Sequence, residues 1–194
     1  MDAIIKSKQM TRTSLFFIAL IPDRDLREKI HEIKEDFSQR FESHKALKVY
    51  PHITLKAPFK CSEGGKMELL NWFSETSFQQ KPFLLYLKGF EAFHNKKGPV
   101  VFINPMPSKE LMQIQKELMV GFNSIFPAYV HPVDVSFKPH ITVAYRDLTP
   151  ENFSRAWQEY KDRPFKDVFG VHSIYLLEYD TKKWNVLKDR KLGE

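Results

Sequence analysis

The tetrapeptide Pro-His-Ile-Thr occurs twice in this chain of 194 residues, at 51–54 and at 139–142. An apolar residue follows each copy, Leu55 in the first and Val143 in the second. Side chains alternate across a β-strand, so the histidine and threonine of each copy would share one face while the isoleucine enters the core. An identical pair of strands so far apart predicts a fold made of two related halves.

The sequence around each copy repeats the same order of elements. Apolar residues at helical spacing predict a helix over 26–41 in the first half and over 108–122 in the second. Lys34 is assigned to the polar face of the first helix. Flanking patterns complete a strand-helix-strand-helix-strand order twice, which predicts an α+β fold with repeats at roughly 13–92 and 98–190.

Composition narrows the class of protein. A chain with 42% hydrophobic residues can bury a full core, so we expect one domain over 1–194. The net charge of +6 suits an anionic partner without requiring one. Cys61 is the only cysteine, which excludes an intramolecular disulfide, and the apolar run at 15–21 is too short for a bilayer. We expect a cytoplasmic protein without membrane association, and nothing indicates an obligate protein partner.

The duplicated motif carries the candidate chemistry. If the two halves pack about a pseudo-twofold axis, His52, Thr54, His140 and Thr142 meet in one cleft. Imidazole titrates near neutral pH, so one ring can accept a proton while the other donates one, as phosphodiester cleavage requires. A single His-x-Thr is usually an ordinary polar pair on a strand. Two identical copies at matching points of a repeat favour a catalytic site.

This motif pair resembles the signature of the two-histidine (2H) phosphoesterase superfamily, and most nearly its bacterial RNA 2′,3′-cyclic phosphodiesterases, historically called 2′-5′ RNA ligases. The resemblance extends over roughly 15–187. It implies a bilobal fold with the cleft between two sheets, no metal ion and no cofactor. It further implies that His52 donates a proton to the leaving oxygen, that His140 activates water, and that Thr54 and Thr142 bind phosphate. The implied substrates are RNA ends or small cyclic nucleotides, opened to a 2′-phosphate.

Four neighbouring residues are further candidates for substrate binding. Strand parity places Lys56 on the His52 face, and places Arg146 on the face of the second histidine if that strand continues. Either cation could contact a phosphate, or could be an ordinary solvated charge. Phe59 and Tyr145 could stack on a base, with core packing as the alternative for both.

Three other functions compete with this hypothesis. His131 and Asp134 could join His140 in a metal-dependent phosphoesterase, but the chain has no His-x-His or His-Glu-x-x-His spacing, so no metal site is predicted. A noncatalytic RNA-binding module would use the same cleft but would not need two matched proton carriers. Ligation of 2′-5′ RNA ends is the same chemistry in reverse, and the lack of a Gly-rich phosphate loop argues against an NTP-dependent ligase.

Overall fold

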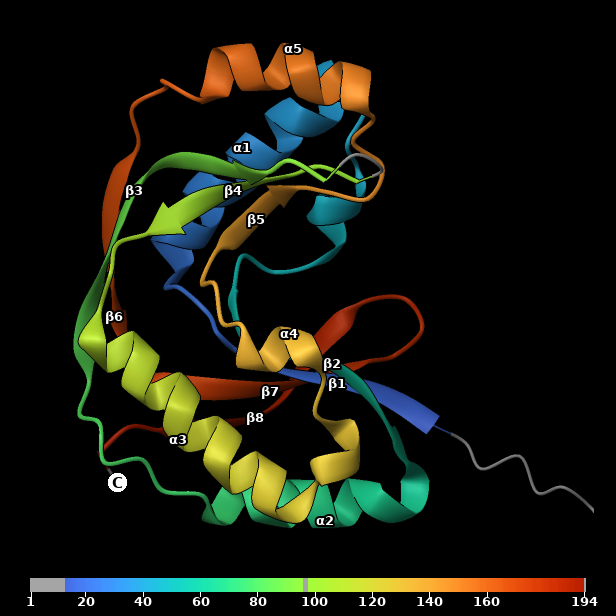
Figure 1. Ribbon diagram of the computed structural model, residues 1–194, viewed down its shortest axis with the longest axis vertical. Helices are drawn as coiled ribbons and strands as arrows, with labels where there is room; N and C mark the ends of the chain where they lie inside the picture. The colour runs from blue at the N-terminus through green and yellow to red at the C-terminus, as the bar shows by residue number, and fades with distance from the viewer. Residues whose placement is uncertain (1–12, 96–97, 194) are drawn as a thin grey trace, which may run out of the picture.

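The computed structural model describes residues 13–95 and 98–193. Its strands form one curled antiparallel sheet with the order β6-β3-β4-β5-β2-β1-β7-β8 (Figure 1). The strands are β1 (Thr13–Leu20), β2 (Ile53–Ser62), β3 (Phe83–Phe93), β4 (Val100–Pro105), β5 (Ile141–Ala144), β6 (Lys166–Val171), β7 (Ser173–Tyr179) and β8 (Trp184–Lys191). The expected α+β class is confirmed.

Helices cover the sheet, and most begin at a short polar side chain. Asp23, Ser62, Ser108 and Thr149 each accept a hydrogen bond from the backbone N–H three residues later, which satisfies a donor that the first helical turn leaves free. The helices are α1 (Arg24–Phe41), η1 (Lys45–Lys48), α2 (Glu63–Glu75), α3 (Lys109–Ile125), η2 (Pro127–Tyr129), α4 (Pro132–Val135) and α5 (Pro150–Tyr160), of which η1 and η2 are short 3₁₀ turns. No helix in the described part of the chain is long and apolar enough to cross a membrane.

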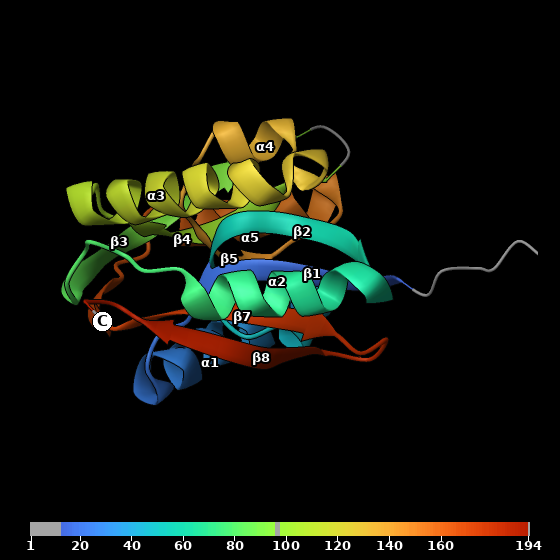
Figure 2. The ribbon, with the colours of Figure 1, turned by 90° about the horizontal axis from the view of Figure 1, so that it is seen from below.

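The sheet has two halves that meet at the duplicated motif. One half is β6-β3-β4-β5 and the other is β2-β1-β7-β8. Strands β2 and β5 are joined by a single pair, Ile53 with Ile141, which are equivalent residues of the two motif copies. The two halves form one continuous, strongly curled sheet (Figure 2). The expected cleft is lined by residues of both halves, so it does not lie between two separate sheets.

The two halves of the sequence exchange elements. Strand β3, from the first repeat, pairs with β4 and β6, and β7, from the second repeat, pairs with β1. Helix α1 packs against β5 and α5, whereas α3 packs against β2. One apolar cluster consequently runs through both halves of the sheet. This shared core fixes the two motif strands relative to each other.

Candidate active site

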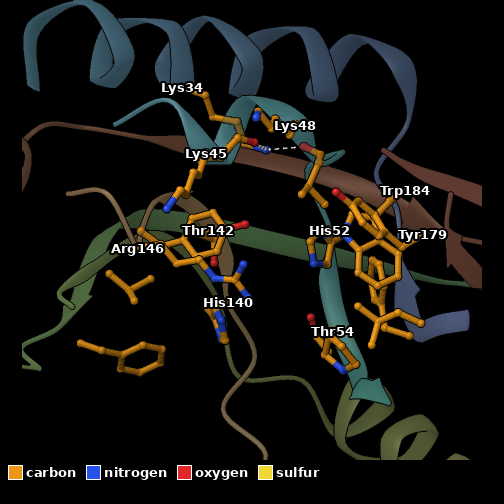
Figure 3. Close-up of a pocket in the computed structure, with 18 of the residues that line it drawn as sticks. Lys34, Lys45, Lys48, His52, Thr54, His140, Thr142, Arg146, Tyr179 and Trp184 are labelled. Atoms are coloured by element: carbon orange, nitrogen blue, oxygen red, sulfur yellow. Dashed lines mark hydrogen bonds between the residues drawn. The ribbon is translucent and has the colours of Figure 1, made fainter. Parts of the chain in front are cut away.

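The four motif side chains line one cavity of about 540 Å³. His52 and Thr54 enter it from the start of β2, and His140 and Thr142 enter it from the start of β5 (Figure 3). The isoleucines between them are fully buried on the opposite face. The alternation predicted from the motif is therefore confirmed, and the structure brings all four residues together.

Both imidazole rings are held in the same way. Nδ1 of His52 lies 2.6 Å from the carbonyl oxygen of Tyr50, and Nδ1 of His140 lies 2.7 Å from that of Lys138. A carbonyl oxygen can only accept a hydrogen bond, so each Nδ1 carries a proton. Nε2 of each ring is then the atom that can accept or donate a proton in the cleft.

Aromatic side chains support both rings from the side. The centroid of Phe17 lies 4.8 Å from that of His52, while Phe93 and Phe102 lie 5.1 Å and 5.4 Å from that of His140. With one carbonyl and at least one aromatic neighbour, each ring has its orientation set before any substrate binds. Such preorganisation lowers the entropic cost of the reaction.

Burial disfavours the charged form of both histidines. It lowers the pKa of His52 to about 4, against the opposing effect of the Tyr50 carbonyl, and the nearby Lys34 and His140 lower it further. Burial also lowers the pKa of His140, by less, with the Lys138 carbonyl opposing. Before substrate binds, both rings are therefore mainly neutral at neutral pH.

Five cations line the same cavity and make it attractive to an anion. Lys45, Lys48, Arg146 and Lys182 are exposed at its rim, whereas Lys34 is almost fully buried. The Lys34 ammonium donates to the carbonyl oxygens of Ala46 at 3.1 Å and Val49 at 2.9 Å, and burial lowers its pKa to about 7. These contacts attach α1 to η1, the turn that leads into the first motif.

The assignment of Lys34 to the polar face of its helix is wrong. Lys34 lies four residues after Ile30 and three before Phe37, both fully buried, so it belongs to the apolar face. That spacing was the available signal for a buried lysine. A buried cation needs hydrogen-bond partners, so a lysine at this spacing also indicates a functional or structural role, which the sequence analysis missed.

The parity prediction for Lys56 is wrong because β2 contains a bulge. Ile18 pairs with Lys56 and Ala19 with Thr54, so Leu55 is skipped and the alternation inverts after the motif. Lys56 is fully buried, with Nζ 3.0 Å from a carboxylate oxygen of Asp134. It stabilises the core and does not reach the cleft.

The other neighbouring candidates divide between cleft and core. Phe59 is 2% exposed and packs against Phe122 and Tyr129, so it cannot stack on a base. Tyr145 and Arg146 do line the cleft, although β5 ends at Ala144 and the strand does not continue as the parity argument required. Arg146 has a φ of 59°, and its guanidinium carbon lies 5.2 Å from the centroid of the Tyr145 ring.

Asp134, which the sequence offered as a candidate metal ligand, has partners in the core. Asp134 accepts hydrogen bonds from the backbone N–H groups of Ala57 and His131, at 2.8 Å and 2.7 Å, besides its ion pair with Lys56. Within residues 13–95 and 98–193, no group of three His, Cys, Asp or Glu side chains is placed to hold a metal ion.

Sequence reasoning missed an aromatic wall of the cleft. Tyr179 and Trp184, which flank the turn between β7 and β8, line the cavity on the His52 side (Figure 3). Trp184 meets Phe17 edge to face, with centroids 4.5 Å apart. No local pattern identified these residues, because the pairing of β7 with β1 brings them to the first motif copy from more than a hundred residues away.

Comparisons with known proteins identify a matching family and relatives of similar length. A family model described as the 2′-5′ RNA ligase superfamily matches residues 22–183, which include both motif copies. A candidate phosphoesterase of Bacillus licheniformis is 28% identical over 177 residues, covering 91% of this chain and 97% of the relative. A candidate phosphoesterase of Geobacillus kaustophilus is 26% identical over 168 residues, covering 85% and 91%.

Solved structures share the fold at low sequence identity. E. coli LigT complexed with 3′-AMP superposes with a TM-score of 0.69 at 19% identity, covering 94% of this chain and 100% of LigT. The protein TT0787 of Thermus thermophilus gives a TM-score of 0.67 at 19% identity, covering 92% and 97%. The fold of this chain is therefore already known from these proteins.

Proposed function

This chain belongs to the 2′-5′ RNA ligase superfamily, a group with phosphoester chemistry, and from this premise we propose that it hydrolyses 2′,3′-cyclic phosphates at RNA ends or in small nucleotides. The observation that carries the proposal is the pair of imidazoles in one cationic cleft, each fixed through Nδ1 with Nε2 available. The complex of LigT with 3′-AMP supports a nucleotide as the ligand class.

The reaction needs one proton acceptor and one proton donor. Nε2 of His140 takes a proton from water as the water oxygen attacks phosphorus, and the bond from phosphorus to the 3′ oxygen breaks. Nε2 of His52 gives its proton to that oxygen, which leaves a 2′-phosphate and a 3′-hydroxyl. The hydroxyls of Thr54 and Thr142 donate to the nonbridging oxygens. Proton exchange with solvent then restores both rings.

The electrostatics of the cleft constrain these roles. The donor must be protonated, yet His52 has the more strongly lowered pKa of the two histidines. A bound phosphate anion favours the charged form of both rings, so substrate binding raises the pKa of the donor ring, which takes its proton from solvent. We keep the resemblance-based assignment of His52 as donor, and the position of the product phosphate tests it.

The first experiment measures turnover and product. Purified protein is incubated with 2′,3′-cyclic nucleotides and with RNA ending in a cyclic phosphate, and phosphorus NMR identifies the product. We expect a 2′-phosphate. A 3′-phosphate would exchange the roles of His52 and His140, and binding without turnover would favour the noncatalytic alternative. If the protein joins RNA with a 5′-hydroxyl end to the cyclic phosphate, it also catalyses the reaction in the direction of ligation.

Histidine variants test the acid-base pair directly. We expect His52→Ala and His140→Ala each to lower kcat by about 10²–10⁴ with little change in thermal stability, because each ring faces the cleft rather than the core. His172→Ala, an exposed histidine outside the cleft, is the matched control and should retain full activity. Full activity of either motif variant would end the assignment of the two histidines as acid and base.

Exhaustive treatment with a chelator should leave turnover intact, because the mechanism uses the two imidazoles and no metal ion. Loss of turnover that one divalent ion restores would favour the metal-dependent alternative.

A further inference from the structure

A second hollow lies on the other side of one wall of the cleft. It has a volume of about 520 Å³ and shares Lys48, Val49 and Trp184 with the catalytic cavity. We call this hollow the outer groove. Its cationic and large aromatic lining residues are Arg24, Arg27, Lys48, Tyr50, Lys183 and Trp184. Phe17 contacts both His52 and Trp184, so the shared wall is adjacent to the first catalytic ring.

The outer groove has a surplus of positive charge. Its single carboxylate, Glu28, already pairs with Arg24 at 2.7 Å. Among the described residues, Arg27, Lys48 and Lys183 form no ion pair, although the carboxylate of Asp180 interacts electrostatically with Lys183. Three cations that form no ion pair in one concave surface attract an anion such as a phosphodiester.

An aromatic and an arginine form a platform in this groove. The guanidinium carbon of Arg27 lies 5.6 Å from the centroid of the Tyr50 ring, and Tyr50 is 43% exposed. Nε of Arg27 is buried and has no hydrogen-bond partner in the described part of the protein. A guanidinium plane beside an exposed tyrosine ring is the kind of surface on which an unpaired base stacks.

We propose that the outer groove binds the nucleotide on the 5′ side of the reacting end, so that the preferred substrate is an RNA oligonucleotide rather than a mononucleotide. This inference rests on the proposed function of the cleft. The linking phosphate would lie beside Lys48, which lines both hollows, and the neighbouring base would lie on Tyr50 and Arg27. Both motif histidines line only the cleft, so the groove contributes binding and not proton transfer.

Kinetics with two substrates test the groove. We compare kcat/KM for adenosine 2′,3′-cyclic phosphate with that for the dinucleotide ApA ending in a 2′,3′-cyclic phosphate. One additional stacked base and one additional phosphate contact should raise kcat/KM at least about tenfold. Arg27→Met and Lys183→Ala should each reduce this advantage and leave hydrolysis of the mononucleotide unchanged. The control is Lys116→Ala, an exposed lysine on α3 that lines neither hollow, which should alter neither rate.

Binding measurements separate failure of the groove from failure of the proposed function. ApA with a terminal 2′-phosphate and adenosine 2′-phosphate are titrated into the parent and both variants by calorimetry. If nothing is hydrolysed but ApA binds more tightly through Arg27 and Lys183, the groove stands and the proposed activity falls. If mononucleotide and dinucleotide react and bind equally in all proteins, the groove inference is overturned while the activity stands. An equal gain in affinity from an abasic dinucleotide would overturn base stacking on Tyr50.

Discussion

At the residue scale, the two histidines show how one local geometry can serve two roles. Each ring donates from Nδ1 to the carbonyl two residues earlier, and each is flanked by phenylalanine. Their surroundings differ because Lys34 lies near His52, whereas no cation contributes to the lowered pKa of His140. The difference between donor and acceptor must therefore come from the charges around the rings and from the substrate.

The lowered pKa values predict the shape of the pH profile. One ring has to be protonated and the other neutral, so kcat/KM should follow a bell. Because both pKa values of the free protein lie below the usual value of about 6.5, the maximum of kcat/KM should lie on the acid side of that value. Bound phosphate raises both pKa values, so the kcat profile should lie at higher pH.

Initial rates from about pH 4 to pH 9 measure both profiles. The acid and alkaline limbs report apparent pKa values of the coupled histidine pair and not of single residues. A flat profile would discard the two-histidine mechanism. A kcat/KM maximum above neutral pH would contradict the lowered pKa values.

Removal of the Lys34 charge should change the titration of His52. The ammonium is protonated in the acid range where His52 titrates, and its charge disfavours the imidazolium. Lys34→Met should therefore raise the pKa of His52, which NMR titration of the imidazole resonances measures. Lys45→Met removes an exposed rim charge that does not contribute to the lowered pKa of His52, and it is the matched control. An unchanged His52 pKa in Lys34→Met would refute the coupling.

At the scale of elements, contacts between segments far apart in the sequence fix the rim of the cleft. Asp147 follows β5, and its carboxylate accepts from the hydroxyl of Ser43 at 3.2 Å and from the backbone N–H groups of His44 and Lys45, both at 2.9 Å. These bonds satisfy the first donors of η1, where a negative charge is favourable. One carboxylate thus joins the two rims of the cleft, with Lys34 attaching the other end of η1.

Asp147→Ala should loosen this rim. Loss of a charged acceptor with three donors should lower the free energy of unfolding by about 1–2 kcal/mol and raise KM more than it lowers kcat. Urea unfolding and steady-state kinetics measure these effects. Glu151→Ala, which removes an exposed carboxylate in the first turn of α5, is the control. Equal values of KM for Asp147→Ala and the parent would show that η1 does not depend on this residue.

At the scale of the whole molecule, the exchange of elements makes the two halves interdependent. The first helix of each repeat packs against the motif strand of the other, and one apolar cluster includes both motif isoleucines. The chain therefore cannot be divided between the two repeats without separating α1 from β5 and α3 from β2. The assignment of residues 1–194 to one domain is a proposal that this interdependence supports.

We therefore expect one cooperative unfolding transition. Trp157 on α5 and Trp184 on β8 report on opposite halves of the sheet. In the paired variants Trp72→Phe/Trp157→Phe and Trp72→Phe/Trp184→Phe, urea transitions followed by fluorescence should each coincide with circular dichroism of the same protein. Separate midpoints for the two reporters would show two independently folding lobes.

The sequence alone determined those features that depend on local periodicity. The helices over 24–41 and 109–125 lie close to their predicted limits because an apolar stripe must be buried wherever the helix packs. His52, Thr54, His140 and Thr142 reach the same cleft because alternation is a property of any strand and the motif is duplicated.

Only the tertiary structure decided which other residues surround those four. A bulge at Leu55 turned the side chain of Lys56 into the core, and the packing of α1 buried Lys34. The pairing of β7 with β1 brought Trp184 to the wall of the cleft. Strand pairing and register between distant segments depend on how all the apolar faces pack together. Alternation and helical spacing are set by neighbours along the chain, whereas the cleft wall and the outer groove are set by contacts between segments that only the folded core brings together.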